Sequence, residues 1–202
     1  MNVKDKSLSK ETLCDALEDL ADRMEKKGKT AEINLYGGAV FVLSHQTRLT
    51  TLDVDYTLRS GENISEEIKA TGKAKGLPSD WMNSGVKAFT MSKENPSHFE
   101  RNQFFKHSNL TIHQANPDYL LAMKCMASRN VKDISDIKFL VKKIGIRSFK
   151  ELEEKVTPFY PTLGIHPRFH AIQDELFKPE VTLERNNSVT PTNNIASRSP
   201  IR

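Results

Sequence analysis

The stretch of sequence that decides the fold is residues 35–58, LYGGAVFVLSHQTRLTTLDVDYTL. Residues 32–36 alternate between polar and apolar side chains, which predicts a strand that ends at a tight turn formed by Gly37 and Gly38. Residues 39–46 are mostly apolar and predict a short helix. Residues 52–58 alternate again and predict a second strand. This part of the chain therefore mixes strands and helices around one glycine turn.

The flanking sequence predicts several further helices. Asn116-Pro117-Asp118 is a helix start, because Asn can cap, Pro fits the first helical position and Asp complements the helix dipole. Ser148 and Glu151 have the spacing of a capping box. The helices are predicted over residues 9–27, 63–73, 117–128, 133–144, 148–156 and 167–177. Further strands are predicted over residues 87–91 and between residues 104 and 112, with a polar loop around Pro96.

Composition divides the chain into three parts. Apolar content falls after residue 178, where Ser, Thr, Asn and Pro dominate, which predicts a disordered tail. We therefore expect a main domain over residues 1–146, a C-terminal helical extension over residues 147–178 and a disordered tail over residues 179–202.

Charge and composition exclude several classes of protein. The chain has 202 residues, of which 37% are hydrophobic and 28% charged, so a wholly disordered protein is excluded. No apolar run approaches the about 18 residues that a membrane span needs, and no apolar signal segment follows the first lysines, so we expect a cytoplasmic protein. The two cysteines lack CxxC spacing, which indicates neither a disulfide framework nor a zinc cluster. A net charge of +4 is compatible with an anionic partner but does not require one.

Asp53 and Asp55 are candidate metal ligands. Successive side chains of a strand point to opposite faces, so residues 53 and 55 share a face and can converge on one hard cation such as Mg2+. Gly37 and Gly38 let the backbone approach phosphate oxygens, and the helix that follows offers free N–H groups. Together these features describe a nucleotide site.

Each feature also has a simpler interpretation. A Gly-Gly pair alone is more often a tight turn than a phosphate cradle, and an Asp-x-Asp strand alone is more often a solvated edge. The two motifs in this order favour the nucleotide site over these simpler interpretations, because two like charges on one strand face are costly unless a cation offsets them. Trp81 is expected to pack in the interior rather than to stack on a base.

Residues 35–58 resemble the signature of the nucleotidyltransferase superfamily, in which a Gly-Gly or Gly-Ser turn, a helix and an Asp-x-Asp strand follow one another. Residues 116–146, NPDYLLAMKCMASRNVKDISDIKFLVKKIGI, resemble the second signature of its bacterial abortive-infection (AbiE-type) toxin branch. Residues 77–89, LPSDWMNSGVKAF, look like a stretch that recurs in uncharacterised bacterial members close to that branch. The resemblance covers most of residues 30–146.

The resemblance implies an α+β fold, with a nucleotidyltransferase-like mixed sheet flanked by helices and a small C-terminal helical part. It implies Mg2+-dependent transfer of a nucleotidyl group from an NTP to an acceptor such as tRNA or another RNA, by a toxin that is paired with an antitoxin protein. The residues carried over from the two signatures are Gly37 and Gly38 as phosphate holders, Asp53 and Asp55 as metal ligands, Lys124 as a phosphate contact, Arg129 beside the nucleotide, and Asp133 or Asp136 as the extra carboxylate.

Two alternatives stay open at this point. Asp133 can be a helix cap as readily as a catalytic group, which makes Asp136 the preferred catalytic carboxylate. Ala39 stands where many members of the superfamily carry a serine, and residues 86–113 show no third strand carboxylate. The second reading of the chain is therefore a catalytically degenerate member of this fold that binds a nucleotide, RNA or a partner protein.

Overall fold

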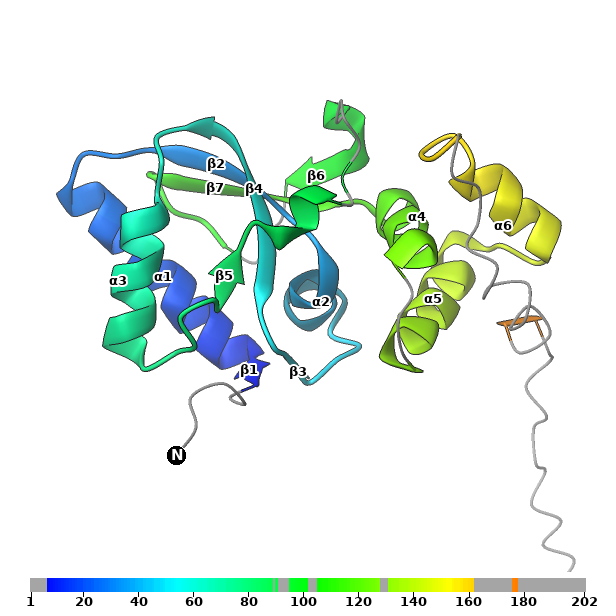
Figure 1. Cartoon of the computed structure of the whole chain (residues 1–202), viewed down its shortest axis with the longest axis horizontal. Coiled ribbons are helices and arrows are strands. Elements are labelled where there is room, and N and C mark those ends of the chain that lie inside the picture. Colours follow the sequence, from blue (N-terminus) through cyan, green and yellow to red (C-terminus); the bar gives the residue numbers. More distant parts are fainter. Residues whose placement is uncertain are drawn as a thin grey trace, which may run out of the picture.

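The structure is a computed structural model that describes residues 7–88, 90, 95–101, 105–127, 131–161 and 176–177. It has an α+β fold built on one mixed sheet, with helices beside the sheet and a group of helices at one end of it (Figure 1). The fold class expected from the sequence is confirmed. Among the described residues, no helix has both the length and the apolar character that crossing a membrane requires.

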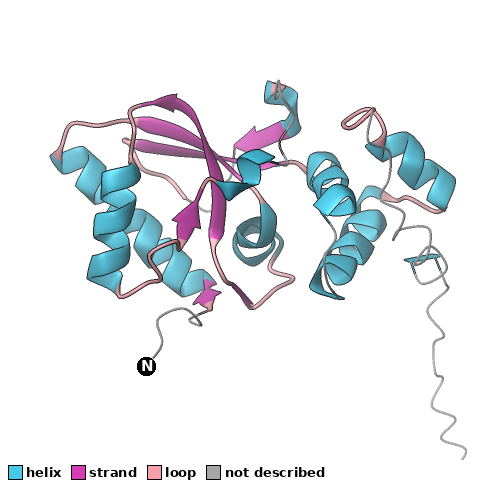
Figure 2. Cartoon of the chain, in the orientation of Figure 1, coloured by secondary structure: helices cyan, strands magenta, loops and turns pink. Residues whose placement is uncertain are grey.

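Five strands form the sheet in the order β5-β4-β2-β7-β6 (Figure 2). The central strand β2 (Ala31–Leu35) pairs antiparallel with β4 (Val54–Gly61) and parallel with β7 (Leu110–Ala115). The edge strands are short: β5 (Met82–Asn83) runs parallel to β4, and β6 (Phe99–Arg101) runs antiparallel to β7. The C-terminal end of β2 therefore lies next to the N-terminal end of β4, and the glycine turn lies close to the Asp-x-Asp segment.

Helices α1 (Lys10–Lys26) and α3 (Ser65–Lys75) pack against each other beside the sheet (Figure 1). Ser9 caps α1 by accepting a hydrogen bond from the backbone N–H of Thr12 at 3.2 Å. The buried side of α1 is the apolar stripe expected from its periodicity, formed by Leu13, Ala16, Leu17, Leu20, Ala21 and Met24. Before α1, strand β1 (Leu8–Ser9) pairs with β3 (Thr50–Thr51) in a separate two-stranded sheet.

The helix after the glycine turn begins earlier than the sequence predicts. It starts at Gly37 as α2 (Gly37–Val40) and continues as the π-helical segment η2 (Phe41–His45). Gln46 ends it with a left-handed backbone, φ 54°. The glycines are therefore the first turn of the helix rather than a loop before it.

The strand predicted over residues 52–58 also differs from the structure. β4 starts at Val54 and extends to Gly61, so Leu52 and Asp53 precede the strand. Asp55 is therefore a strand residue, whereas Asp53 immediately precedes the strand.

The segment between α3 and β7 is where the sequence was least informative. Residues 85–88 form a 3-10 turn, η3 (Gly85–Ala88), so the strand predicted over residues 87–91 was wrong at its start, and residues 89 and 91–94 lie outside the described residues. The loop around Pro96 contains η4 (Pro96–His98) and then strand β6, which was not predicted. Of the strand expected between residues 104 and 112, only the part from Leu110 onward is a strand, and Phe104 lies outside the described residues.

Helical segments follow β7 in the described part of the chain. They include α4 (Pro117–Ala127), α5 (Val131–Ile144) and α6 (Phe149–Val156), and α4 packs against both α5 and α6. Asn116 and Ser148 accept hydrogen bonds from backbone N–H groups at the starts of α4 and α6, as their sequence positions predict. The helix predicted over residues 167–177 falls outside the described residues except for positions 176–177, and so does the predicted tail over residues 179–202.

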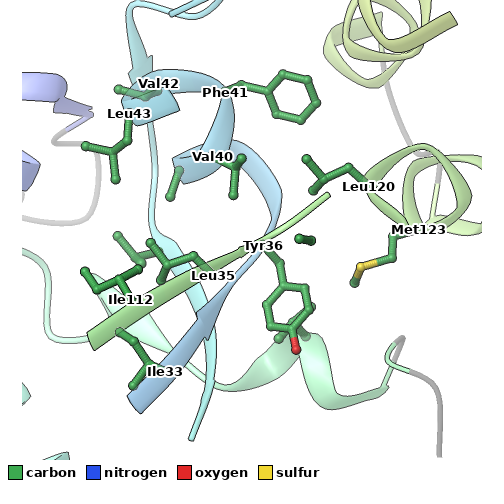
Figure 3. Close-up of a cluster of buried hydrophobic side chains, with 14 of the residues drawn as sticks. Ile33, Leu35, Tyr36, Val40, Phe41, Val42, Leu43, Ile112, Leu120 and Met123 are labelled. Carbon is green, nitrogen blue, oxygen red and sulfur yellow. The ribbon is translucent and has the colours of Figure 1, made fainter. Parts of the chain in front are cut away.

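One hydrophobic cluster joins the sheet to the helices that carry the candidate site. Figure 3 shows Ile33 and Leu35 of β2, Ile112 of β7, Val40 to Leu43 after the glycine turn, and Leu120 and Met123 of α4 gathered around Tyr36. Tyr36 is fully buried and its Oη shares a hydrogen bond with Thr57 Oγ1 at 2.9 Å. Trp81 is fully buried as well and donates to Ile68 O at 3.0 Å, which confirms its packing role.

Glu67 of α3 ties the end of α1 to the rest of the domain. Its side chain has no exposed surface, and its carboxylate pairs with Lys27 Nζ at 2.7 Å and with Lys29 Nζ at 3.0 Å. Burial alone raises the pKa of this carboxyl, but the hydrogen bonds from Lys27 and Lys29 outweigh burial and lower the pKa from 4.5 to about 2.

The substitution Glu67→Gln is expected to lower the free energy of unfolding at pH 7 by about 2 kcal/mol. A carboxyl whose pKa is lowered by folding stabilises the protein fully above its unfolded pKa, and this contribution is lost as the pH falls toward the folded pKa. The difference between wild type and variant in urea unfolding should therefore shrink between about pH 5 and pH 2.5. Glu66→Gln, at the exposed neighbouring residue, is the control, and a difference that does not change with pH would contradict the assignment.

Candidate functional site

Two adjoining cavities open where the sheet meets α4 and α5. Their volumes are about 500 Å³ and about 580 Å³. Both cavities are lined by the same set of sequence-predicted residues, together with Leu52; the shared set is Gly37, Asp53, Asp55, Lys124 and Asp133. The tertiary structure thus brings residues of the two sequence signatures to one place.

Asp55 lies at the start of β4, opposite the glycine turn. The backbone N–H of Tyr36 donates to Asp55 O at 3.0 Å, which fixes the end of β2 against β4. Asp53 precedes the strand, and its Oδ2 accepts a hydrogen bond from Asn83 Nδ2 of β5 at 3.0 Å. Thr51 Oγ1 donates to Asp53 O at 3.2 Å. Both carboxylates line both cavities, although only Asp55 is a strand residue.

The two glycines are required by their surroundings. Gly37 has φ 58°, and a Cβ at this position would lie 2.6 Å from Asp55 Oδ2. A Cβ on Gly38 would overlap Thr51 Oγ1 and lie 3.4 Å from Arg48 Nη1. Any side chain here would fill the space in which the backbone meets these polar groups. The glycines therefore allow the backbone to lie directly against Asp55 and Thr51 at the edge of the cavities.

Lys124 of α4 reaches the same point from the helical side. Its Nζ lies 2.7 Å from Asp133 Oδ1 and 2.9 Å from Asp136 Oδ2, and its side chain is 14% exposed. Asp133 stands in the first turn of α5 and not at its cap, since the helix begins at Val131. The ammonium group is therefore held by two carboxylates of the neighbouring helix while its residue lines both cavities.

Asp133 and Asp136 have different surroundings. Asp133 lines both cavities, whereas Asp136 is not among the described residues that line either of them. Asp136 is 3% exposed, and its carboxylate accepts hydrogen bonds from Arg48 Nε at 2.7 Å and from Arg48 Nη2 at 2.5 Å. The geometry thus gives Asp133, rather than Asp136, access to a molecule in the cavities.

Arg48 was not singled out from the sequence. It lies 88 positions before its partner Asp136 and belongs to the loop that leads from η2 to β3. A lone arginine in a polar loop carries no periodic or motif signal, so only the pairing in space reveals it. Arg129, which the resemblance places beside the nucleotide, lies outside the described residues.

The walls of the two cavities differ in chemistry. Leaving aside the shared residues, one cavity is lined mainly by apolar side chains, those of Val86, Leu120, Met123 and Ala127. The other is lined mainly by polar groups, from Ser7, Gly38, Arg48, Thr50 and Thr51. The apolar wall suits a flat ring such as a nucleobase, and the polar wall with its arginine suits an anion.

The prediction that residues 86–113 hold no strand carboxylate was wrong, because the unpredicted strand β6 carries Glu100; this residue lines neither cavity among the described residues. Strand β7 contains no carboxylate. Its six residues are LTIHQA, and Gln114, at the end near the glycine turn, accepts a hydrogen bond from Ser44 Oγ. Ala39 is fully buried. The carboxylates that line the cavities are therefore Asp53, Asp55 and Asp133, among the residues that the structure describes.

A second cluster of possible metal ligands lies away from these cavities. One ligand atom from each of Asp22, Glu25 and His107 lies within 4.8 Å of the other two. However, the backbone N–H of Asn109 donates to His107 Nδ1 at 3.2 Å, so a neutral imidazole carries its proton on Nε2. That nitrogen lies 3.6 Å from Asp22 Oδ1. A metal would need the lone pair that this proton occupies, so the cluster is better described as a surface contact between an imidazole N–H and a carboxylate.

The residues of the shared site fit a magnesium nucleotide on chemical grounds. Carboxylate oxygens are the ligands that Mg2+ prefers, and the cavities are lined by two carboxylates of the Asp-x-Asp segment, by Gly37 and by a lysine. Comparison of the chain with known proteins finds no family model that matches, no curated protein that matches and no solved structure that matches.

Proposed function

We propose that the protein is a metal-dependent nucleotidyltransferase that transfers a nucleotidyl group from an NTP to an acceptor. The observation that carries the proposal is the meeting of Gly37, Asp53, Asp55, Lys124 and Asp133 in two cavities that share these residues. These residues come from two distant stretches of the chain, and a transferase needs room for both a nucleotide and an acceptor beside its carboxylates.

Each residue has a chemical role in this proposal. Asp53 and Asp55 would hold Mg2+, which would neutralise phosphate charge and activate the attacking hydroxyl. Gly37 and Gly38 would offer backbone N–H groups to phosphate oxygens, and Lys124 would add a positive charge to the leaving pyrophosphate. Asp133 would accept the proton of the acceptor hydroxyl, because it lines the cavities and is 14% exposed.

The acceptor and the partner follow from the resemblance to the AbiE-type branch. RNA, including tRNA, is the proposed acceptor, and an antitoxin protein is the proposed partner. If the protein is such a toxin, its expression should arrest bacterial growth, and Asp55→Asn should relieve the arrest at equal protein level.

A second candidate function is supported by two features of the site. Ala39 supplies no hydroxyl at the glycine turn, and the observed β7 supplies no carboxylate. The second candidate is therefore a protein of this fold that binds a nucleotide, RNA or a partner protein without catalysing transfer.

One experiment separates the two candidates. The full-length chain is titrated with each of the four NTPs by calorimetry, with and without Mg2+, and then incubated with radiolabelled NTPs and total RNA. Mg2+-dependent binding followed by labelling of RNA is expected from a transferase. Binding without labelling would favour the second candidate, and the absence of binding to any NTP together with the absence of labelling would contradict the proposal.

Lys124→Met is expected to weaken Mg2+·NTP binding by about tenfold, because a charge-assisted contact to phosphate contributes about 1.5 kcal/mol or more. Calorimetry at constant ionic strength measures this effect. Lys142→Met is the matched control, since Lys142 is an exposed residue in the last turn of α5. Equal affinities of the two variants for Mg2+·NTP would contradict the assignment of Lys124 as a phosphate contact.

A further inference from the structure

The buried ion pair between Arg48 and Asp136 gives Arg48 a role at the candidate site. We infer that Arg48 is a positioning residue, which holds both oxygens of Asp136 and thereby keeps Lys124 at the junction of the two cavities. The inference rests on the proposed function, in which Lys124 binds the phosphates of the nucleotide.

Arg48 holds Asp136 by two hydrogen bonds, and we call this Arg48–Asp136 pair the clamp. Nε and Nη2 of the guanidinium reach the two different oxygens of Asp136, at 2.7 Å and 2.5 Å. A planar fork bound to both oxygens fixes the plane of the carboxylate, which a single ammonium contact does not. Asp136 Oδ2, held in this way, lies 2.9 Å from Lys124 Nζ. The clamp therefore determines where one of the two acceptors of Lys124 stands.

The charges of the group balance only when Arg48 is present. Arg48 and Lys124 are the two cations, and Asp133 and Asp136 are the two carboxylates that contact them. Because Asp136 is 3% exposed, its charge is costly unless cations compensate for it. Without Arg48, Asp136 would depend more strongly on Lys124 for compensation of its charge. The charge of Lys124 would then be less available to a phosphate, and the cavities would become more negative.

Phe41 provides a common support for the two cations. The Arg48 Cζ lies 5.6 Å and the Lys124 Nζ 5.7 Å from the centroid of its ring. Phe41 is fully buried in η2, the helical segment that follows the glycine turn. Contacts of this kind are attractive and limit where each cation can stand. Arg48 and Lys124 therefore both contact the ring of Phe41, which belongs to the helical segment that follows the glycine turn.

A direct role for Arg48 is the competing explanation. Arg48 lines the polar cavity, and its Nη1 is the atom that a Cβ on Gly38 would approach to 3.4 Å. A phosphate bound at the glycine turn could therefore contact Arg48 itself. The two explanations differ in one respect: positioning acts through Lys124, whereas direct binding does not need Lys124.

A double-mutant cycle separates them. Binding of Mg2+·ATP to the full chain is measured by calorimetry for wild type, Arg48→Met, Lys124→Met and the double variant. We expect Arg48→Met to weaken binding about tenfold in wild type, and to change the Kd by less than about twofold when Lys124 is already Met. The same loss in both backgrounds would overturn the inference and make Arg48 a direct ligand.

Two further variants exclude a merely structural effect. Arg48→Lys keeps the charge without the fork, and we expect it to restore part of the binding that Arg48→Met loses. Arg59→Met is the matched control, since Arg59 pairs with Glu32 at 3.8 Å on the sheet and lines neither cavity among the described residues. A lower Tm for Arg48→Met with an unchanged Kd would overturn the inference.

A measurement without nucleotide tests the clamp itself. Arg48→Met should lower the Tm by several degrees, and adding Asp136→Asn should restore part of this loss, because the buried carboxylate no longer lacks its partner. Additive losses would overturn the clamp. If Arg48→Met alone does not fold, the double variant Arg48→Met/Asp136→Asn replaces it. We expect this double variant to bind Mg2+·ATP about tenfold more weakly than wild type does. A wild type that binds no NTP would contradict the proposed function and leave the Tm cycle to decide on the clamp.

Discussion

Asp55→Asn is expected to abolish Mg2+-dependent nucleotide binding and transfer while the protein stays folded. Asn keeps the shape of the side chain and removes the negative charge that would hold the metal. Because changes to groups that merely support metal ligands cost 10-fold to 100-fold, we expect the loss of a ligand to weaken binding by about 100-fold or more. Calorimetry with ATP and Mg2+ measures the affinity, and labelled NTP measures transfer.

The control for this prediction is Asp22→Asn. Asp22 lies on α1, its side chain is 60% exposed, and it lines neither cavity among the described residues. The Tm of Asp55→Asn should stay within about 3 °C of wild type, which excludes unfolding as the cause of any loss. Unchanged Mg2+-dependent binding in Asp55→Asn would contradict the assignment of Asp55 as a metal ligand.

Gly37→Ala has the second large expected effect, and it changes both stability and binding. The positive φ of 58° costs an L-residue about 1 kcal/mol. The added Cβ would lie 2.6 Å from Asp55 Oδ2, so the carboxylate must move, and overpacking of this kind costs a further about 1–3 kcal/mol. We expect a loss of about 2–4 kcal/mol in urea unfolding together with loss of Mg2+-dependent NTP binding.

Gly28→Ala separates the cost of the positive φ from the cost of the contact with Asp55. Gly28 has φ 65°, close to that of Gly37, but a Cβ there would meet nothing within 4 Å. This variant should lose only the about 1 kcal/mol that the backbone conformation costs, and it should bind nucleotide as wild type does. If Gly37→Ala behaved like Gly28→Ala in both measurements, the close approach of the glycine turn to Asp55 would have no functional importance.

The regular elements of the fold were predictable where side-chain periodicity is strong. The apolar stripe of α1 and the caps at Asn116 and Ser148 each act over a few neighbouring residues, and each is present in the structure. β2 is a strand, as its polar and apolar alternation predicts, but Asn34 is buried with its apolar neighbours. The failures lie in short elements. β6 has three residues and η3 has four, too few for any period to appear.

The candidate site was predictable only in part. Gly37, Gly38 and the Asp-x-Asp segment stand close together in the sequence, and the resemblance named Lys124 and both carboxylates of α5. Asp53 was expected to meet Asp55 through strand alternation, but the observed strand begins at Val54. The carboxylate of Asp53 accepts a hydrogen bond from Asn83, which lies 30 positions away and which no local pattern indicates.

The sequence by itself determined which residues are candidates for holding a metal and phosphates, because charge, the absence of a side chain and helix periodicity are local properties. Only the tertiary structure decided which of these residues line the cavities and which are buried in ion pairs. α4 and α5 pack so that Asp133 lines the cavities while Asp136 is buried against Arg48. That division depends on desolvation, which is a property of the packed protein: a carboxylate removed from water needs its own cations, and a carboxylate that still faces a cavity can serve a ligand.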